Sequence, residues 1–427
     1  MKFFFYNLIS LLLLPFILIY FICRMFSRKR NPAAWPNQLG FTKITAKDPK
    51  VWIHAVSVGE SVAGASMVSA LKKISKVSVV FSTTTKNGQD MAKKTVKDAS
   101  DFIYFPIDYF LCVWQALLRV RPAAFACVDT EIWPNFFTVA HMMGVKVAMI
   151  NGTISDRTWR GARIVPWVYR MALENADLLC MQSYNDARRV IALGAGPERV
   201  FVTGNLKADQ FTEHVSPEEL AELRRNFGVK AGQKVFVAGS TNPGEDQPVV
   251  EAFVAARKVF PDMKLIIAPR QINRADEIEA IAADFGFTCG RRSDGTAADE
   301  ARDIAVLDTF GELARVYELC DISFVGGSLI PKGCHSILQP ISLGKGVFFG
   351  PYTFKAKALV TQAKRFGAGF EVSGGSQLGE KLIAFLSDPK KMASIKKGCE
   401  DMMEENIGAA DRTAAKFAEL LPKEENK

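Results

Sequence analysis

The chain has 427 residues, of which 48% are hydrophobic and 23% are charged, so it can bury a large core and is long enough for two domains. This composition excludes a disordered chain, and the formal net charge of +9 favours anionic partners such as nucleic acid, acidic lipids or phosphorylated small molecules. The eight cysteines lack C-x-x-C spacing and the four histidines lack an H-x-x-x-H pair, so neither a disulfide-dense module nor a zinc site is expected.

The first predicted element is a membrane anchor over residues 3–23. This stretch is almost wholly apolar and close to the roughly 20 residues that a helix needs to cross a bilayer. Only Lys2 precedes it, whereas a basic group follows it, made of Arg24, Arg28, Lys29 and Arg30. This asymmetry keeps the downstream chain in the cytoplasm, and no small-residue cleavage site follows. Pro15 leaves open an anchor that lies in the membrane surface instead of crossing it.

Beyond the anchor, short apolar runs alternate with helix-like segments, which is typical of parallel sheets covered by helices on both faces. In the first half, strands are predicted from residue 51 and over residues 77–82, 102–105, 123–128, 145–150, 178–181 and 200–202. After a polar stretch the pattern restarts, with strands over residues 235–238, 265–268, 322–325 and 347–349. We therefore predict an α/β fold with two doubly wound, Rossmann-like domains and a central cleft.

The predicted division is an anchor over residues 1–30, an N-terminal domain over residues 31–212 and a C-terminal domain over residues 213–427. Ligand pockets prefer the interface between such domains, at the carboxyl ends of the strands. The residues that directly follow each predicted strand are therefore the candidates for ligand contacts.

Ser57 to Glu60 end the first predicted strand and open a helix. This position would place the Glu60 carboxylate at the mouth of the ligand crevice, where it can act as a general base. The same Ser-x-x-Glu spacing is that of a capping box, in which both side chains hydrogen-bond the backbone of the first helical turn. The ten residues around this turn do not choose between the two roles.

Two further candidate groups lie in the N-terminal domain. Asp129 and Glu131 follow a strand and precede Pro134, which is well placed to open a helix. Acidic residues at such a position also serve as ordinary complements of the helix dipole. Lys207 follows the last strand of this domain, where it can neutralise a departing phosphate or simply be solvated.

In the C-terminal domain, Gly326, Gly327 and Ser328 end a buried strand, and a helix is predicted to start near Ser336. Glycine amides and a helix amino terminus can hold phosphate, although the spacing is not that of a dinucleotide fingerprint and a plain turn is the alternative. Gly239-Ser240-Thr241 and Pro269-Arg270 follow neighbouring strands. Together these loops favour a ligand that carries phosphate.

Several blocks taken together resemble the 3-deoxy-D-manno-octulosonic acid (Kdo) transferases of lipid A assembly, which are membrane-associated glycosyltransferases of the GT-B fold. The blocks are VWIHAVSVGE, DTEIWPN, GNLKAD, GSTNPGE, APR, DTFGEL, DISFVGGSL, CHSILQP and GKGVFFGP, and they span residues 45–375. The resemblance implies transfer of Kdo from CMP-Kdo to lipid IVA, the lipid A precursor, in lipopolysaccharide core biosynthesis. It further implies inversion, no metal or other cofactor, no nucleic acid partner, and work at the cytoplasmic side of the inner membrane among its lipids.

The resemblance also implies roles for individual residues. Glu60 matches the proton acceptor of the family, and Glu131 and Lys207 match residues that stabilise the transition state. The residues that match CMP-holding segments are Pro269, Arg270, Phe310, Gly311, Glu312, Ser336, Ile337, Leu338 and Gln339. The chemistry is consistent, because the acceptor hydroxyl needs a base and the departing phosphate needs cationic or N–H partners.

The chain departs from the family pattern at the donor segment. Where the family has Gly-Gly-His-Asn-x-Leu-Glu-Pro, this chain has Ser336 for Asn and Gln339 for Glu, and Lys355 replaces the customary Asn after Phe354. Gln339 can still hydrogen-bond a ribose hydroxyl but lacks an anionic oxygen. These departures support a second hypothesis, a membrane-tethered GT-B protein that binds nucleotide or lipid without transferase activity. A third, a sugar-nucleotide epimerase on the same fold, would need no anchor.

Overall fold

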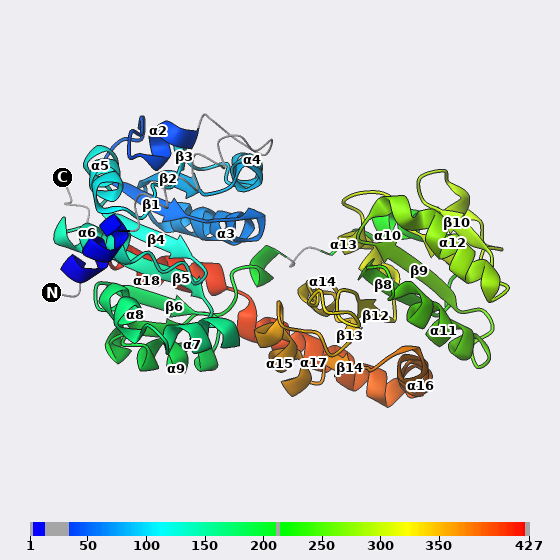
Figure 1. Cartoon of the computed structure of the whole chain (residues 1–427). Helices are drawn as coiled ribbons and strands as arrows, with labels where there is room; N and C mark the ends of the chain where they lie inside the picture. Colours follow the sequence, from blue (N-terminus) through cyan, green and yellow to red (C-terminus); the bar gives the residue numbers. More distant parts are fainter. Residues whose placement is uncertain (1–2, 13–33, 211–213, 423–427) are drawn as a thin grey trace. The chain divides into compact units, whose positions relative to one another are not determined.

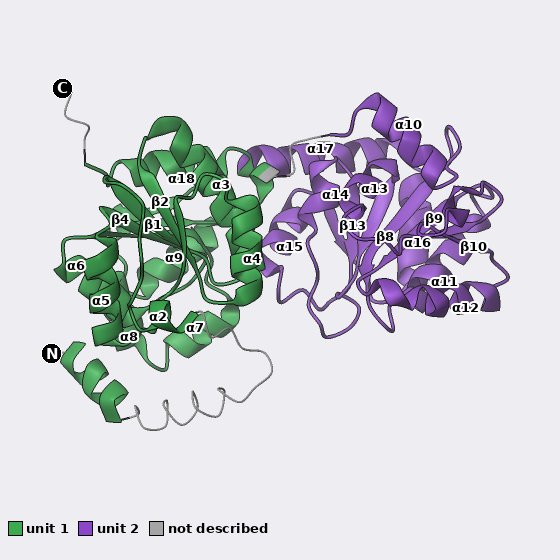
Figure 2. Ribbon diagram, turned by 90° about the horizontal axis from the view of Figure 1, so that it is seen from above, with its two compact units in different colours: residues 1–210, 406–427 green, residues 211–405 purple. Residues whose placement is uncertain are grey.

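Two seven-stranded parallel sheets organise the chain, one in each of two units (Figure 1). The computed structural model describes residues 3–12, 34–210 and 214–422. Unit 1 comprises Met1–Gln210 and Asn406–Lys427, and unit 2 comprises Phe211–Glu405 (Figure 2). The prediction of two parallel α/β domains is confirmed.

In unit 1 the strand order is β3-β2-β1-β4-β5-β6-β7. The strands are β1 (Lys50–His54), β2 (Ser78–Thr83), β3 (Asp101–Tyr104), β4 (Ala124–Val128), β5 (Lys146–Gly152), β6 (Leu178–Met181) and β7 (Val200–Val202). Each run that was predicted as a strand in this half forms one, because apolar and β-branched residues fill both faces of the sheet. The order reverses between β1 and β4, and such a reversal opens a crevice at the carboxyl ends of the strands.

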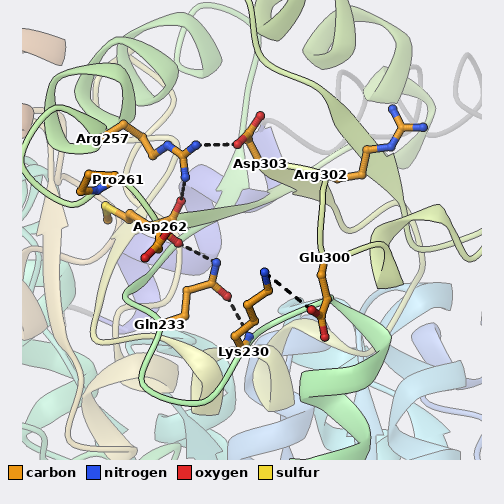
Figure 3. Close-up of a pocket in the computed structure, with 9 residues that line it drawn as sticks. Lys230, Gln233, Arg257, Pro261, Asp262, Glu300, Arg302 and Asp303 are labelled. Carbon is orange, nitrogen blue, oxygen red and sulfur yellow. Dashed lines mark hydrogen bonds and ion pairs between the residues drawn. The ribbon is translucent and has the colours of Figure 1, made fainter.

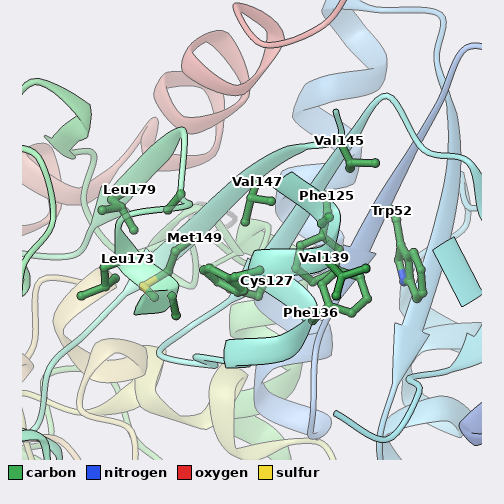
Figure 4. Packing of buried hydrophobic residues seen from close by; sticks show 14 of the residues in the cluster. Trp52, Phe125, Cys127, Phe136, Val139, Val145, Val147, Met149, Leu173 and Leu179 are labelled. Atoms are coloured by element: carbon green, nitrogen blue, oxygen red, sulfur yellow. The ribbon is translucent and has the colours of Figure 1, made fainter. Parts of the chain in front are cut away.

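Helices cover both faces of this sheet. They are α2 (Trp35–Gln38), α3 (Val58–Ile74), α4 (Lys86–Thr95), α5 (Phe110–Val120), α6 (Pro134–Met142), α7 (Asp156–Ala162), α8 (Pro166–Leu173) and α9 (Tyr184–Ala192). On one face the rings of Trp52, Phe125 and Phe136 form a dense aromatic core (Figure 4). The Trp52 and Phe136 centroids are 5.1 Å apart, and those of Phe125 and Phe136 are 4.2 Å apart. This core fixes α6 against β1 and β4, the two strands at the reversal.

In unit 2 the strand order is β10-β11-β9-β8-β12-β13-β14. The strands are β8 (Val235–Thr241), β9 (Lys264–Pro269), β10 (Cys289–Arg291), β11 (Ile304–Val306), β12 (Ile322–Val325), β13 (Gly346–Phe349) and β14 (Gly369–Glu371). The helices are α10 (Pro217–Asn226), α11 (Asp246–Arg257), α12 (Ala275–Asp284), α13 (Leu313–Val316), α14 (Leu338–Ser342), α15 (Lys357–Arg365), α16 (Gly375–Leu386) and α17 (Pro389–Asn406). The order reverses between β8 and β12, so the loops after these strands are the expected ligand loops of this unit.

The carboxyl-terminal helix α18 (Ala409–Ala418) belongs to unit 1 and not, as predicted, to the C-terminal domain. Its apolar residues Ala409, Ala414 and Phe417 are fully buried in the core that α3 covers. Asp209 accepts hydrogen bonds from the backbone N–H groups of Gly408 at 2.5 Å and Ala410 at 2.7 Å, and so holds the first turn. The sequence pattern shows that α18 is amphipathic, but not which of the two sheets it covers.

Residues 3–12 form a helix that packs on unit 1. The Phe3 ring meets Phe110 edge-on, with centroids 6.0 Å apart, and Asn7 Nδ2 donates to Asn135 Oδ1 at 2.8 Å. Residues 13–23, the remainder of the predicted anchor, lie outside the described residues. Among the residues that are described, no helix has the length and apolar character needed to span a bilayer.

Candidate active site

Glu60 lies in the first turn of α3, directly after β1. Its Oε2 atom accepts hydrogen bonds from the backbone N–H groups of Val56 at 2.6 Å and Ser57 at 2.9 Å. The capping interaction is therefore present. No hydrogen bond within the described part of the chain engages Oε1, and the side chain is half-buried. One carboxylate oxygen thus caps the helix while the other is available to take a proton.

Asp129 and Glu131 lie at the carboxyl end of β4, next to β1 in the sheet. Burial, together with the nearby charges of Glu60 and Asp129, raises the pKa of Glu131 to about 7. Burial and the Glu60 charge raise the pKa of Asp129 to about 6, although the Lys207 ammonium opposes this shift. Neither carboxyl lies in the first turn of α6. A role as helix-dipole complement would lower these pKa values, so their rise instead reflects three carboxyl groups in one enclosed place.

Lys207 completes this group from the loop after β7. The position of a Cβ on Gly59 would lie 3.7 Å from Lys207 Nζ, which places the ammonium beside the first turn of α3. Its charge lowers the pKa of Asp129, as expected for a cation close to a carboxyl group. Of the predicted residues of unit 1, the structure thus brings Glu60, Glu131 and Lys207 to one place.

Three amide side chains that the sequence reasoning missed hold the Lys207 loop. Asn205 Oδ1 accepts from the Lys207 backbone N–H at 3.0 Å, and Asn205 Nδ2 donates to Gln182 Oε1 at 3.2 Å. Gln182 Nε2 in turn donates to the Asn151 backbone carbonyl at 2.9 Å, and Asn151 Oδ1 accepts from Leu206 N–H at 2.9 Å. Each amide residue stands at or just past the end of β5, β6 or β7, which is the signal that would have found them.

In unit 2 the amides of the Gly-Gly-Ser turn are occupied by the chain itself. The buried carboxylate of Glu245 accepts from Gly327 N–H at 2.6 Å and from the N–H groups of Ser328 and Leu329, both at 2.9 Å. It also accepts from Asn242 N–H at 3.0 Å. The anion predicted for these amides is therefore Glu245, and they are not available to a ligand phosphate. Gly326 is needed for packing, since a Cβ there would lie 2.7 Å from Thr241 Cα.

In unit 2, cationic side chains are therefore the candidates for binding a ligand phosphate, instead of the turn amides. Arg270 follows β9 with an exposed side chain, and its backbone N–H donates to the Thr241 carbonyl at 2.8 Å. Pro269, the last residue of β9, is buried. Burial, together with the charges of Arg270, Lys355 and Lys332, lowers the pKa of His335 to about 4. These three cations therefore lie near one neutral imidazole.

The other predicted donor residues differ in what they offer a ligand. The Phe310 side chain is 80% exposed, whereas Ile337 and Leu338 are buried, so only the backbone of the latter two can meet a ligand. Glu312 accepts from Arg292 Nη2 at 3.1 Å and from Thr309 Oγ1, and Gly311 has a φ of +88°. Ser336 is exposed and Gln339 is half-buried at the start of α14.

A pocket of about 160 Å³ opens elsewhere in unit 2 (Figure 3). It lies between loops that precede β8, β9 and β11, at the amino-terminal ends of these strands. Arg270 lies at the other end, directly after the carboxyl end of β9. Two ion pairs line it, with Arg257 Nη2 2.7 Å from Asp303 Oδ1 and Lys230 Nζ 3.7 Å from Glu300 Oε2. We therefore do not assign it to the ligand.

Comparisons with known proteins identify a family and several relatives that this chain resembles. The sequence model of the family described as 3-Deoxy-D-manno-octulosonic-acid transferase (kdotransferase) matches residues 33–210. A 3-deoxy-D-manno-octulosonic acid transferase of Haemophilus influenzae is 25% identical over 413 residues, which cover 96% of each chain. A bifunctional glycosyltransferase/methyltransferase of Fusobacterium nucleatum is 32% identical over 326 residues, 75% of this chain, and this chain spans half the length of that relative.

The fold itself is shared more widely. The crystal structure of UDP-GlcNAc 2-epimerase from Neisseria meningitidis superposes with a TM-score of 0.62 at 12% identity, covering 87% of this chain and 100% of that chain. This likeness shows a fold of the GT-B type, but at such identity it carries no statement about the reaction. Sequence similarity, in contrast, does separate the protein families that share this fold. The chain belongs to the family of 3-deoxy-D-manno-octulosonic acid transferases.

Proposed function

We propose that this chain is an inverting glycosyltransferase that moves Kdo from CMP-Kdo to a hydroxyl of lipid IVA, with Glu60 as the general base. The observation that carries the proposal is the free Oε1 of Glu60 beside Glu131 and Lys207 at the reversal between β1 and β4. Sequence similarity to Kdo transferases supports the sugar, and the cations after the strands of unit 2 support a phosphate-bearing donor.

In the proposed reaction, Glu60 takes the proton of the acceptor hydroxyl as its oxygen attacks the anomeric carbon of Kdo. The bond from that carbon to the phosphate oxygen breaks, and CMP leaves with the bonding electrons. Attack opposite the leaving group inverts the centre. The carboxyl groups of Glu131 and Asp129 favour the positive charge that develops on the sugar, and Lys207 offsets negative charge that develops on the departing phosphate.

The chain's exposed amino-terminal helix supports a proposed place at the cytoplasmic side of the inner membrane. Phe4, Leu8 and Leu12 recur every four residues and are 67%, 40% and 69% exposed. Phe5, Ile9 and Leu11 widen this apolar surface. A helix that buries one face on the protein and offers the other to lipid suits an enzyme whose acceptor is itself a lipid.

The test is a transfer assay with CMP-Kdo and lipid IVA, with product mass read directly. We expect Glu60→Gln to lower kcat by about 10²–10⁴-fold, the usual contribution of a general base. Glutamine keeps an oxygen for the Val56 and Ser57 amides, so the helix cap survives and the loss reports the base alone. Glu60→Ala removes both roles and should also lower the melting temperature.

The matched control is Glu400→Gln, the same change at an exposed position of unit 2, which should leave kcat unchanged. Full activity in Glu60→Gln would show that Glu60 is not the general base and that it only caps the helix.

The departures at Ser336, Gln339 and Lys355 favour the second candidate, a membrane-tethered binding protein without transferase activity. Binding of CMP by a wild-type chain that makes no product would support that candidate.

A further inference from the structure

Three cations of unit 2 lie in loops that follow the carboxyl ends of its strands. Arg270, Lys332 and Lys355 follow β9, β12 and β13 respectively, and all three are exposed. None forms an ion pair with a carboxylate in the described ranges, whereas Arg257, Arg274 and Arg291 of the same unit all do. Unpaired cations at the carboxyl ends of parallel strands in one sheet are a feature of anion sites.

A buried scaffold brings these cations together. Lys332 Nζ donates to Asn242 Oδ1 at 3.2 Å, and Asn242 Nδ2 lies 3.3 Å from His335 Nε2. A Cβ on Gly333 would lie 2.7 Å from Lys355 Cγ, so the stem of Lys355 crosses the residue next to Lys332. The three cations therefore flank the same histidine from different loops.

The balance of charge leaves two positive charges uncompensated. His335 is neutral at physiological pH, because burial and the three cations hold its pKa at about 4. Glu245 is the carboxylate bound to this scaffold, and both of its oxygens are occupied by backbone amides. Three positive charges against this single negative charge leave an excess of two, which suits a ligand with two negative groups.

We propose that Lys332 and Lys355 form a subsite for the carboxylate of the donor sugar, beside a phosphate site at Arg270. This inference rests on the proposed function, because it takes the donor to be a nucleotide-linked acidic sugar. The planar guanidinium of Arg270 suits two oxygens of a phosphodiester, while the lysine ammonium groups suit a compact carboxylate. A neutral sugar on the same nucleotide would leave the second charge unmatched, so the lysines select an acidic one.

The experiment measures equilibrium dissociation constants without acceptor, for CMP-Kdo and for cytidine 5′-methylphosphate. Both ligands contain the cytidine phosphodiester, but only CMP-Kdo carries a carboxylate. We expect Lys332→Gln and Lys355→Gln each to weaken CMP-Kdo binding about tenfold and to leave cytidine 5′-methylphosphate within about twofold. Arg270→Gln should weaken both ligands alike. Lys355→Arg should retain the preference for CMP-Kdo, and the exposed Lys390→Gln is the matched control.

Two outcomes would overturn the subsite. Equal weakening of both ligands in the lysine variants would assign the lysines to the phosphate, and unchanged constants for both would leave them without a ligand. Because the readout is binding, it does not depend on turnover. A wild-type chain that binds CMP-Kdo with this preference but makes no product would reject the proposed reaction and keep the subsite.

Discussion

Asn151 donates a hydrogen bond from Nδ2 to Asp129 Oδ1, and both residues have a left-handed backbone, with φ of 56° and 61° respectively. Each stands at the carboxyl end of a strand, Asn151 in β5 and Asp129 directly after β4. Non-glycine residues in this conformation cost of order 1 kcal/mol each and persist where the surroundings determine them. The pair therefore fixes where the Asp129 carboxyl lies relative to Glu60 and Lys207.

Replacement of Asn151 should reduce activity, because the loop that carries Lys207 would no longer be held in place. The fully buried Asn151 side chain also accepts the Leu206 amide, so its removal frees the loop that carries Lys207. We expect Asn151→Gly and Asn151→Ala to lower kcat by about 10–100-fold with little change in KM, as small displacements of reacting groups do. Glycine adopts positive φ freely and alanine does not, so the alanine variant should be less stable by about 1 kcal/mol.

Steady-state kinetics and urea unfolding of both variants check this prediction. A fall in kcat that tracks the loss of stability from variant to variant would indicate a general structural defect. Equal kcat values in two variants of different stability would instead identify Asn151 as a positioning residue.

Asp129 and Glu131 should make stability depend on pH. Their folded-state pKa values of about 6 and about 7 lie above the ordinary values of 3.8 and 4.5. The native state therefore binds these protons more tightly than the unfolded chain, so the contribution to stability is complete below the ordinary values and is lost as the pH rises through about 7. Both groups are partly exposed, so we expect about 1–2 kcal/mol for the pair.

The measurement is the free energy of unfolding at about pH 5 and about pH 8. The double variant Asp129→Asn with Glu131→Gln should lose less stability than the wild type between the two. Glu60→Gln removes a negative charge that raises both pKa values, so it should shift the transition to lower pH. The exposed Glu400→Gln is the control, and an identical pH profile in all variants would contradict the prediction.

Local patterns predicted the strands that carry the site, because a strand such as β1 has the apolar run Val51, Trp52 and Ile53 on both faces and ends at a turn. They also placed Glu60 correctly at the start of α3. The partner of the Gly327 amide was not predictable in this way, since Glu245 lies 82 residues away in sequence. The short strands β10, β11 and β14 were not predicted.

Phe417→Ala should destabilise unit 1 although residue 417 follows all of unit 2 in sequence. The Phe417 ring is fully buried in the core beneath α3. Its truncation leaves a cavity that costs about 3–5 kcal/mol. Hydrogen exchange should quicken in β1 and not in β8. Phe310→Ala, the same change at a side chain that is 80% exposed, should leave the unfolding of both units unchanged, and faster exchange confined to β8 would contradict the assignment of α18.

Glu245 should tolerate glutamine far less well than Glu60 does, because the two carboxylates use their oxygens differently. Glu60 accepts backbone hydrogen bonds with Oε2 alone, whereas Glu245 accepts with both oxygens. In Glu245→Gln the new NH₂ group would face an N–H donor, which we expect to cost about 1–3 kcal/mol. Glu245→Ala leaves four backbone amides without this acceptor and should cost about 3 kcal/mol or more. Unfolding in guanidinium gives these values. Only in Glu245→Gln does the new NH₂ group face a backbone N–H group. Equal stability of Glu245→Gln and Glu60→Gln would therefore contradict the conclusion that both oxygens of Glu245 are needed as acceptors.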